Sequence, residues 1–381
     1  MRSFYEFFAG AGMARAGLGR EWTCVFANDI DAKKAASYTV NWGPEQLTVG
    51  DVSAIKLNDL PGKADLAWAS FPCQDLSLAG NGAGLSGQRS GTFWPFWRLM
   101  ERLSKQRRAP SLVVIENVCG ALASHGGKDF AAIATAIVRA KYRLGALVID
   151  AVQFVPQSRP RLFIVCIRDG TVVPKQLLSK EPNPAWHPPH LTTTYEKLSA
   201  RVKSAWVWWH LPLPPARTMK FSDLIEDEPQ GVAWHTAEET KYLLSLMSPL
   251  NGKKVEQAMR MNVRMVGGIY KRTRRDEAGN RLQRAEVRFD DIAGCLRTPV
   301  GGSSRQSIIL VKGNSVRSRL LSPREAARLM GLPDDYKLPD KYNEAYHLAG
   351  DGVVIPVVRF LAANILEPLL AANEAHDKEA A

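Results

Sequence analysis

The chain has 381 residues, of which 45% are hydrophobic and 23% charged, and its formal net charge is +12 at pH 7. These values are typical of a folded globular protein, and they exclude a disordered or fibrous one. The length predicts two or three domains. Apolar runs such as 162–167 and 353–358 are much shorter than the roughly 18 residues of a membrane-spanning helix. We therefore expect a cytoplasmic protein with no membrane anchor and no secretory leader.

The cysteines also indicate a reducing compartment. There are five of them, and neighbours in sequence are at least 46 residues apart: Cys24, Cys73, Cys119, Cys166 and Cys295. An odd number without paired spacing argues against both a disulfide framework and a zinc site. We expect no metal, and we expect any cysteine used in chemistry to act as a thiolate.

The first 170 residues predict an α/β domain with a Rossmann-like, mostly parallel sheet, because short apolar runs alternate with helical patterns. The expected strands are 2–8, 23–28, 66–70, 112–116 and 162–167, and the expected helices are 13–19, 94–105 and 128–140. Asp29 and Glu116 stand where strands should end. Ligands of open α/β sheets bind at those carboxyl ends.

A smaller second domain is expected to follow, since prolines become frequent after residue 170. We assign 1–180 and 340–381 to the first domain and 181–339 to the second, with the apolar segment 353–370 returning to the first. The tryptophans at 206, 208 and 209 are interpreted as a structural cluster, although base stacking is an alternative.

The excess positive charge lies in one segment. Residues 253–328 hold 18 Lys and Arg against 7 Asp and Glu, a balance of +11. The densest run, 271–275, lies between glycine-containing stretches, which predicts a basic loop or hairpin tip. A localised basic segment is typical of a protein that binds nucleic acid, because its cations displace counterions from phosphates.

The turn Phe8-Ala9-Gly10-Ala11-Gly12 follows the first expected strand and begins a helix, so it can hold a nucleotide-like ligand. Asp29 follows about 20 residues later, where an acidic side chain accepts hydrogen bonds from ribose hydroxyls. Together they predict a cofactor that contains adenosine.

Three further segments carry chemistry at the same expected edge. Phe71-Pro72-Cys73-Gln74 comes directly after a strand, and a glycine- and serine-rich stretch, 77–92, follows and could close as a lid. Glu116-Asn117-Val118 ends another strand. Gln157-Ser158-Arg159-Pro160-Arg161 places two guanidinium groups just before the strand at 162–167.

These segments, together with Arg324-Glu325-Ala-Ala-Arg328-Leu-Met-Gly331-Leu-Pro333-Asp334, resemble the DNA (cytosine-5) methyltransferase family in order and spacing. The resemblance covers nearly the whole chain. It implies a fold that binds S-adenosylmethionine through residues near the turn and the next strand ends: Phe8, Gly10, Gly12, Asp29, Ile30, Asp51 and Pro72. It also implies that the basic segment is the target recognition domain.

The resemblance further implies a covalent mechanism on a cytosine flipped out of the duplex. A Cys73 thiolate would add to carbon 6, Glu116 would stabilise the ring at nitrogen 3, and Arg161 would hold its exocyclic oxygen. Arg159 would lower the pKa of the thiol. We expect DNA contacts from eight residues: Gln74, Ser77, Lys271, Arg272, Arg274, Arg275, Arg297 and Arg305.

The chain departs from the family pattern at three positions. Met13 stands where a second glycine is usual, Ile30 where an aromatic ring is frequent, and Asp351 where Asn is usual. Asp351 keeps an acceptor but loses the amide donor.

We therefore predict a monomeric methyltransferase acting on double-stranded DNA, the modification half of a bacterial restriction-modification pair, with a cognate endonuclease as a functional partner. Two alternatives stay open at this point. A related enzyme could act on transfer RNA, and a catalytically silent DNA-binding protein could share the fold, although the latter would be expected to lose Cys73 or Glu116.

Overall fold

The structure, a computed structural model, describes residues 1–72, 84–87, 90–275, 279–298 and 305–380. It divides into two compact units. Unit 1 comprises Met1–Asp150, Pro160–Pro215 and Val353–Ala381, and unit 2 comprises Ala151–Arg159 and Ala216–Gly352. The divisions thus differ from the boundaries expected at 180 and 340.

Unit 1 extends past residue 180 because the segment up to 215 packs on the core of this unit. Leu191, Val202 and Trp206 belong to the same buried cluster as the sheet residues. The C-terminal segment from Val353 also belongs to unit 1.

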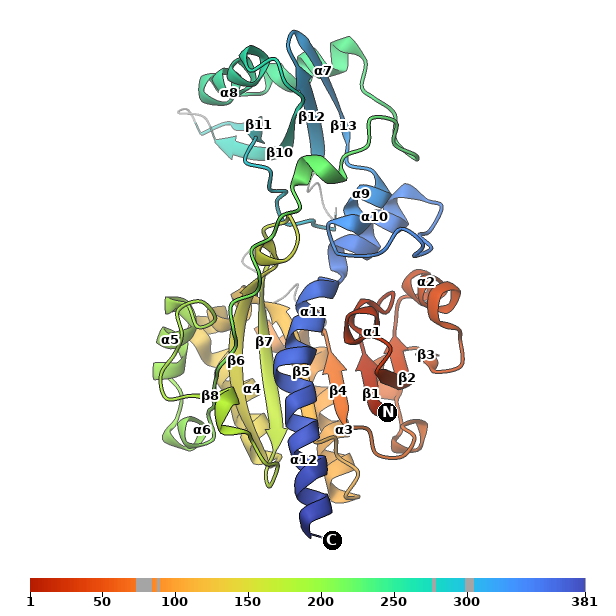
Figure 1. Ribbon diagram of the computed structural model, residues 1–381, viewed down its shortest axis with the longest axis vertical. Helices are drawn as coiled ribbons and strands as arrows, with labels where there is room; N and C mark the ends of the chain where they lie inside the picture. The colour runs from red at the N-terminus through yellow and green to blue at the C-terminus, as the bar shows by residue number, and fades with distance from the viewer. Residues whose placement is uncertain (73–83, 88–89, 276–278, 299–304, 381) are drawn as a thin grey trace. The chain divides into compact units, whose positions relative to one another are not determined.

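A seven-stranded sheet forms the centre of unit 1, with the strand order β3-β2-β1-β4-β5-β7-β6. β1 to β5 are parallel to one another, and β7 is antiparallel to both β5 and β6 (Figure 1). The strands are β1 (Arg2–Phe7), β2 (Trp22–Asp29), β3 (Leu47–Val49), β4 (Leu66–Ala69), β5 (Leu112–Val118), β6 (Tyr142–Asp150) and β7 (Pro160–Arg168). The predicted Rossmann-like sheet is confirmed, and sequence reasoning missed β3 and β6.

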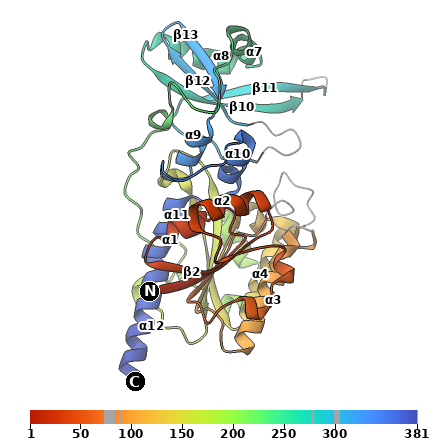
Figure 2. The same ribbon diagram turned by 90° about the vertical axis from the view of Figure 1, so that its right-hand side faces the viewer.

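Helices cover both faces of this sheet: α3 and α4 lie on one face, and α1, α11 and α12 lie on the other (Figure 2). The helices of unit 1 are α1 (Met13–Leu18), α2 (Ala32–Trp42), α3 (Phe93–Lys105), α4 (Lys128–Arg139), α5 (Pro189–Glu196), α6 (Ala200–Ser204), α11 (Ile355–Leu361) and α12 (Glu367–Ala380). α1 and α11 pack closely because Gly17 has no side chain. A Cβ atom there would lie 2.4 Å from Cβ of Val358.

Among the described residues, one helical run is long and apolar enough to cross a membrane by length and composition alone. It spans Tyr342–Glu379, with a mean hydropathy of 1.8 over its most apolar 18 residues, and 56% of that window is buried inside the protein. Val358, Leu361 and Ile365 are buried in this run. We therefore interpret its apolar part as core helix.

Unit 2 has a four-stranded antiparallel sheet in the order β11-β10-β12-β13. Residues Leu243, Val255 and Ala258 of α7 and α8 pack against buried side chains of this sheet. The elements are α7 (Ala237–Ser245), α8 (Pro249–Arg260), β10 (Met265–Arg275), β11 (Arg281–Arg288), β12 (Ser307–Lys312), β13 (Ser315–Leu320), α9 (Pro323–Arg328) and α10 (Tyr342–Asp351).

The basic run at 271–275 was expected in a loop or hairpin tip, and it lies in strand at the outer end of the β10–β11 hairpin. All five residues lie in β10 and pair with β11, with Lys271 opposite Ala285 and Arg275 opposite Arg281. Pairing with β11 begins at the buried end of β10, where Ile269 lies opposite Val287 and both side chains are buried. The pairing then continues without interruption to Arg275.

The tryptophan cluster is structural, as predicted. Trp206, Trp208 and Tyr195 pack against one another, and the short strand β9 (Trp208–Trp209) pairs with β8 (Leu178–Ser179). His187 lies edge-on to Trp208, with ring centroids 4.9 Å apart, and it is 2% exposed. Its Nδ1 accepts a hydrogen bond of 2.8 Å from the Asn183 backbone N–H.

Burial of His187 predicts an acid-dependent loss of stability. Burial lowers the pKa of His187 from 6.5 to about 4, so the folded protein holds this ring neutral while the unfolded chain protonates it below pH 6.5. The free energy of unfolding therefore decreases as the pH falls from 6.5 towards 4, by about 2 kcal/mol between pH 7 and pH 5. Urea unfolding at both pH values should show a smaller loss for His187→Gln. An equal loss in both proteins would contradict this role.

Candidate functional site

The turn after β1 is shaped by three residues with positive φ: Phe8 (56°), Gly10 (56°) and Gly12 (77°). A Cβ atom at Gly12 would lie 2.4 Å from Nε1 of Trp42, so this position requires glycine. No atom lies within 4 Å of the corresponding point at Gly10. Gly12 therefore allows the turn to pack against α2, and Gly10 leaves open space beside the backbone.

Asp29 fixes this turn to the end of β2. Its Oδ2 accepts a hydrogen bond of 2.7 Å from the Gly10 backbone N–H, and its Oδ1 accepts one of 2.8 Å from the Asp31 N–H. Asp29 is 8% exposed, and burial raises the pKa of its carboxyl group. Each carboxylate oxygen has a second lone pair, so Asp29 can shape the turn and still accept from a ligand hydroxyl.

Glu6 of β1 binds the backbone of α1, the helix that follows the turn, and sequence reasoning missed this residue. It is 1% exposed in β1, and Oε1 accepts a hydrogen bond of 3.2 Å from the Arg15 backbone N–H in α1. Burial raises the pKa of Glu6 to about 8. The guanidinium of Arg15 donates to the Tyr38 hydroxyl over 2.9 Å and lies 4.9 Å from the Trp42 ring centroid. The signal was present in the sequence, as an acidic residue inside an apolar strand.

Ile30 and Asp51 extend the same edge of the sheet. Ile30 follows β2 and is 66% exposed. Asp51 is exposed beyond β3, and hydrogen bonds from Ser53 lower the pKa of its carboxyl group. Asn28 holds the two strand ends together, since its Nδ2 donates to the backbone oxygens of Thr48 and Gly50. An open backbone turn, an exposed apolar side chain and two carboxylates suit an adenosine-containing cofactor.

The backbone that leads to Cys73 is held by two side chains. Nδ2 of Asn117 donates to the Phe71 carbonyl oxygen over 3.0 Å, and Oγ of Ser90 donates to the Pro72 carbonyl oxygen over 3.0 Å. Asn117 is buried in β5. Cys73 itself, with Gln74 and Ser77, lies outside the described residues.

Glu116 and Arg161 meet at this edge of the sheet. β5 and β7 run antiparallel, with Val118 opposite Arg161, so the carboxyl end of β5 lies beside the start of β7. Nε of Arg161 is 3.4 Å from Oε1 of Glu116, and their side chains are 16% and 11% exposed. Such a pair can present a carboxyl group and a guanidinium together to one polar ligand.

The other cysteines of unit 1 are poor candidates for a nucleophile. Burial raises the pKa of Cys24 and of Cys119 to about 11, and it raises the pKa of Cys166 further. Their thiols therefore stay protonated at neutral pH. Within the described part of the chain, no group of three or more His, Cys, Asp or Glu residues could hold a metal ion.

Arg159 is bound within unit 2. It is 2% exposed and donates to the backbone oxygens of Leu296, Gly350 and Gly352 over 2.7–2.9 Å. Its Nη1 also lies 3.4 Å from Sγ of Cys295. The two arginines of one short motif thus belong to different units, and Arg161 is the one that pairs with Glu116 within unit 1.

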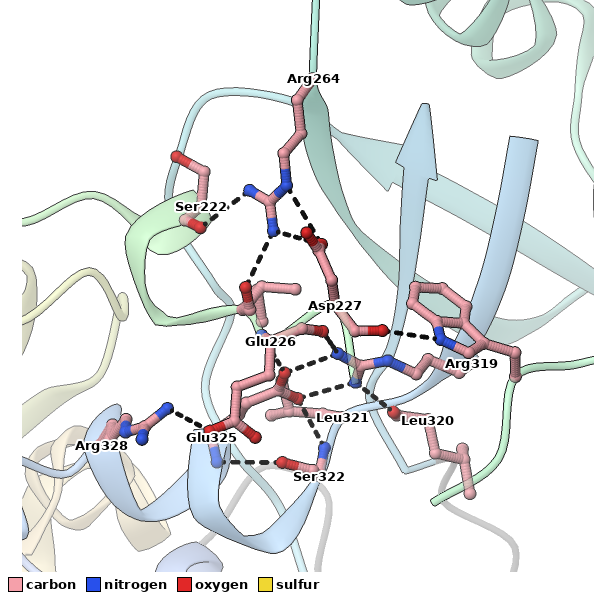
Figure 3. Close-up of polar contacts among 12 residues, drawn as sticks. Ser222, Glu226, Asp227, Arg264, Arg319, Leu320, Leu321, Ser322, Glu325 and Arg328 are labelled. Atoms are coloured by element: carbon pink, nitrogen blue, oxygen red, sulfur yellow. Dashed lines mark hydrogen bonds and ion pairs between the residues drawn. The ribbon is translucent and has the colours of Figure 1, made fainter. Parts of the chain in front are cut away.

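The motif around Arg324 forms a buried anchor in unit 2 (Figure 3). Glu325 and Arg319 are both 0% exposed, and two hydrogen bonds of 2.6 and 2.8 Å join them. Glu325 also accepts from the backbone N–H groups of Ser322 and Glu226. Removing one partner of such a buried pair leaves the other charge buried without compensation and costs about 3–5 kcal/mol, so unit 2 requires both residues together. Sequence reasoning missed Arg319.

The basic residues expected at DNA are all on unit 2. Arg272 and Arg274 are exposed on β10 and both pair with Glu286 of β11, at 3.2 and 3.1 Å. Exposed pairs of this kind are weak and leave the cations accessible to phosphate. Arg297 is exposed, and the guanidinium of Arg305 lies 5.4 Å from the Tyr342 ring centroid.

Comparison with known proteins gives consistent results over nearly the full length. Residues 2–367 match the family model described as C-5 cytosine-specific DNA methylase. The chain is 26% identical to the Type II methyltransferase M.HhaI of Haemophilus parahaemolyticus, over 95% of this chain and 93% of that protein. It is 25% identical to the Type II methyltransferase M.NlaX of Neisseria lactamica, over 98% of this chain and 99% of that protein.

Solved structures agree on the fold. A crystal structure of S. pombe Dnmt2 methyltransferase superposes with a TM-score of 0.57 at 15% identity, over 97% of this chain and 99% of that one. The Entamoeba histolytica methyltransferase EhMeth gives a TM-score of 0.59 at 15% identity, over 98% of both chains. The fold expected from the sequence is thereby confirmed.

Proposed function

Because the chain belongs to the C-5 cytosine-specific DNA methylase family, we propose that it transfers the methyl group of S-adenosylmethionine to carbon 5 of a flipped-out cytosine in a specific sequence of double-stranded DNA. We further propose that it protects host DNA in a restriction-modification system. Its curated relatives M.HhaI and M.NlaX are named as Type II methyltransferases.

One observation carries the proposal: the proposed catalytic acid, Glu116, is adjacent in β5 to Asn117, which binds the backbone just before the proposed nucleophile. Glu116 ends β5 beside Arg161, and its neighbour Asn117 binds the backbone oxygen of Phe71, two residues before Cys73. The carboxyl group and the guanidinium can hold a pyrimidine ring, and we propose that Cys73 supplies the thiol that activates it.

The reaction follows from the electron demand of cytosine, whose carbon 5 is a poor nucleophile. The Cys73 thiolate adds to carbon 6, forming a carbon–sulfur bond and moving an electron pair to carbon 5. Glu116 stabilises the ring by hydrogen bonding or protonation at nitrogen 3, and Arg161 binds the exocyclic oxygen. After methylation at carbon 5, the proton on that carbon leaves to solvent and the carbon–sulfur bond breaks, which regenerates Cys73.

When bound, S-adenosylmethionine supplies an electrophilic methyl group. The residues that would hold it are Phe8, Gly10, Gly12, Asp29, Ile30, Asp51 and Pro72. The open space at Gly10 and the exposed Ile30 and Asp51 support this assignment.

Asp51→Ala should weaken S-adenosylmethionine binding by about 1 to 3 kcal/mol, because the carboxylate accepts a hydrogen bond from the adenine amino group. Titration calorimetry measures this directly. Asp31→Ala is a matched control, since Asp31 is a neighbouring exposed acid whose side chain caps α2. Unchanged affinity in Asp51→Ala would remove that residue from the site.

Neutralising Lys271, Arg272, Arg274 and Arg275 together should weaken DNA binding and flatten its salt dependence. Each lost phosphate contact lowers the slope of log K against log salt by about 0.9. Fluorescence anisotropy at several salt concentrations measures the slope. A control with the same charge change neutralises four exposed cations of unit 1: Lys175, Lys180, Lys197 and Arg201. Equal slopes in both variants would exclude β10 from the DNA interface.

Bisulfite sequencing of DNA from cells that express this chain tests the proposed function. The expected result is 5-methylcytosine at one recurrent sequence. An assay with transfer RNA in parallel tests the alternative substrate, and methylation of RNA without methylation of DNA would overturn the proposal.

A further inference from the structure

Gln157 and Arg159, both in unit 2, bind the backbone next to Arg297. Nη1 of Arg159 donates to the Leu296 carbonyl oxygen over 2.9 Å, and Oε1 of Gln157 accepts from the Leu296 N–H over 3.1 Å. Both backbone groups of Leu296 are therefore bound by buried side chains. The position of the backbone just before Arg297 is fixed.

The other side of Arg297 is held by the end of α10. Nη2 of Arg159 donates to the carbonyl oxygens of Gly350 and Gly352, which flank Asp351. The Thr298 hydroxyl donates to Oδ1 of Asp351. A Cβ atom at Gly350 would lie 3.2 Å from the carbonyl carbon of Arg297, so glycine allows this close approach. The backbone is thus fixed on both sides of an arginine whose own side chain is exposed.

Building on the proposed function, we infer that Arg159 and Asp351 are positioning residues that present Arg297 to a base edge, and so help to determine which sequence is methylated. An arginine distinguishes guanine by two hydrogen bonds, to O6 and N7, and this geometry requires a fixed backbone. The carboxylate of Asp351 suits this purpose because it only accepts, and the Thr298 hydroxyl donates.

This role also accounts for the burial of Arg159. Its terminal nitrogens bind three backbone carbonyls from two segments, at 2.7–2.9 Å. A lysine would keep the charge at this position, but its three donors lie on one nitrogen and do not reproduce the two separate nitrogens from which Arg159 binds these carbonyls. A charge effect on Cys73 and a positioning effect on Arg297 therefore respond differently to Arg159→Lys.

The test is methylation of a pool of random-sequence duplexes by purified native protein and variants, followed by bisulfite sequencing. Arg297→Met should reduce discrimination at one base pair by roughly 5- to 150-fold. Asp351→Ala and Arg159→Lys should reduce it at that same base pair. Asp351→Asn should retain it, because the amide oxygen still accepts from Thr298. Asp351→Ala should add nothing in an Arg297→Met background.

Three outcomes would overturn the inference. The first is unchanged discrimination by Asp351→Ala, and the second is a loss of discrimination by Asp351→Ala that is equal at every base pair. The third is an Arg159→Lys variant that keeps discrimination but shifts the pH dependence of Cys73 alkylation. Asp351 is exposed, so its variants remain informative if Arg159→Lys does not fold. Absence of any cytosine methylation by the native chain would instead contradict the proposed function itself, and with it this inference.

Discussion

Replacing Cys73 with alanine should abolish methyl transfer while leaving DNA binding intact. Without the thiolate, no carbon–sulfur bond forms at carbon 6, and carbon 5 stays too electron-poor to react. Loss of a nucleophile in covalent catalysis lowers turnover on the order of 10⁶-fold. Transfer of labelled methyl groups to DNA measures activity, and gel shift or anisotropy measures binding.

Cys119→Ala is the matched control for this experiment. Cys119 follows β5 in unit 1, and burial raises the pKa of its thiol to about 11, so it carries little thiolate at neutral pH. Its removal should preserve methyl transfer. The assignment of the nucleophile would be wrong if Cys119→Ala were inactive and Cys73→Ala active.

Glu116→Ala should slow methyl transfer by about 10²- to 10⁴-fold, the usual contribution of a positioned acid or base. The cysteine adduct can still form in this variant, but the charge that develops on the ring lacks a partner. Single-turnover methylation at saturating DNA isolates this step.

The ion pair supplies a second comparison. Arg161 lies 3.4 Å from Glu116, so the two side chains should act as one unit. Arg161→Met combined with Glu116→Ala is expected to be less damaging than the sum of the single variants. Glu116→Gln should also be slow, because the amide cannot protonate the ring. Transfer at the native rate by Glu116→Ala would contradict the assigned role.

The sheet edge that carries the site could be predicted from the sequence because its signals are local. Polar residues such as Asp29 and Glu116 follow apolar runs directly, and parallel strands bring their carboxyl ends to one edge. The expected proximity of Glu116 to Arg161 follows in the structure from the antiparallel pairing of β5 with β7.

The strand β6 was missed although its sequence held a clue. Gly145 interrupts the apolar run of this strand, and a Cβ atom there would lie 2.1 Å from the Val207 carbonyl oxygen. A glycine inside a strand marks such a close approach of another backbone. Its partner lies about 60 residues away, which no local pattern reveals.

The separation of Arg159 from Arg161 could not be predicted either. The two residues are two positions apart, yet Arg159 is bound by carbonyls of residues 296, 350 and 352. Such contacts depend on the tertiary fold of unit 2. The flanking glycines of the basic run indicated a loop or hairpin tip, and pairing with β11 extends the strand through this run to Arg275 at the outer end of the hairpin.

The most direct test of covalent activation is tritium release from DNA labelled at carbon 5 of cytosine. If Cys73 adds to carbon 6, each turnover must expel the hydrogen on carbon 5. The native protein should therefore release label into water in step with methyl incorporation, and Cys73→Ala should do neither. Methylation at the exocyclic amine needs no adduct and releases no label. Full methylation by the native protein with the tritium retained would contradict the covalent mechanism and the role of Cys73.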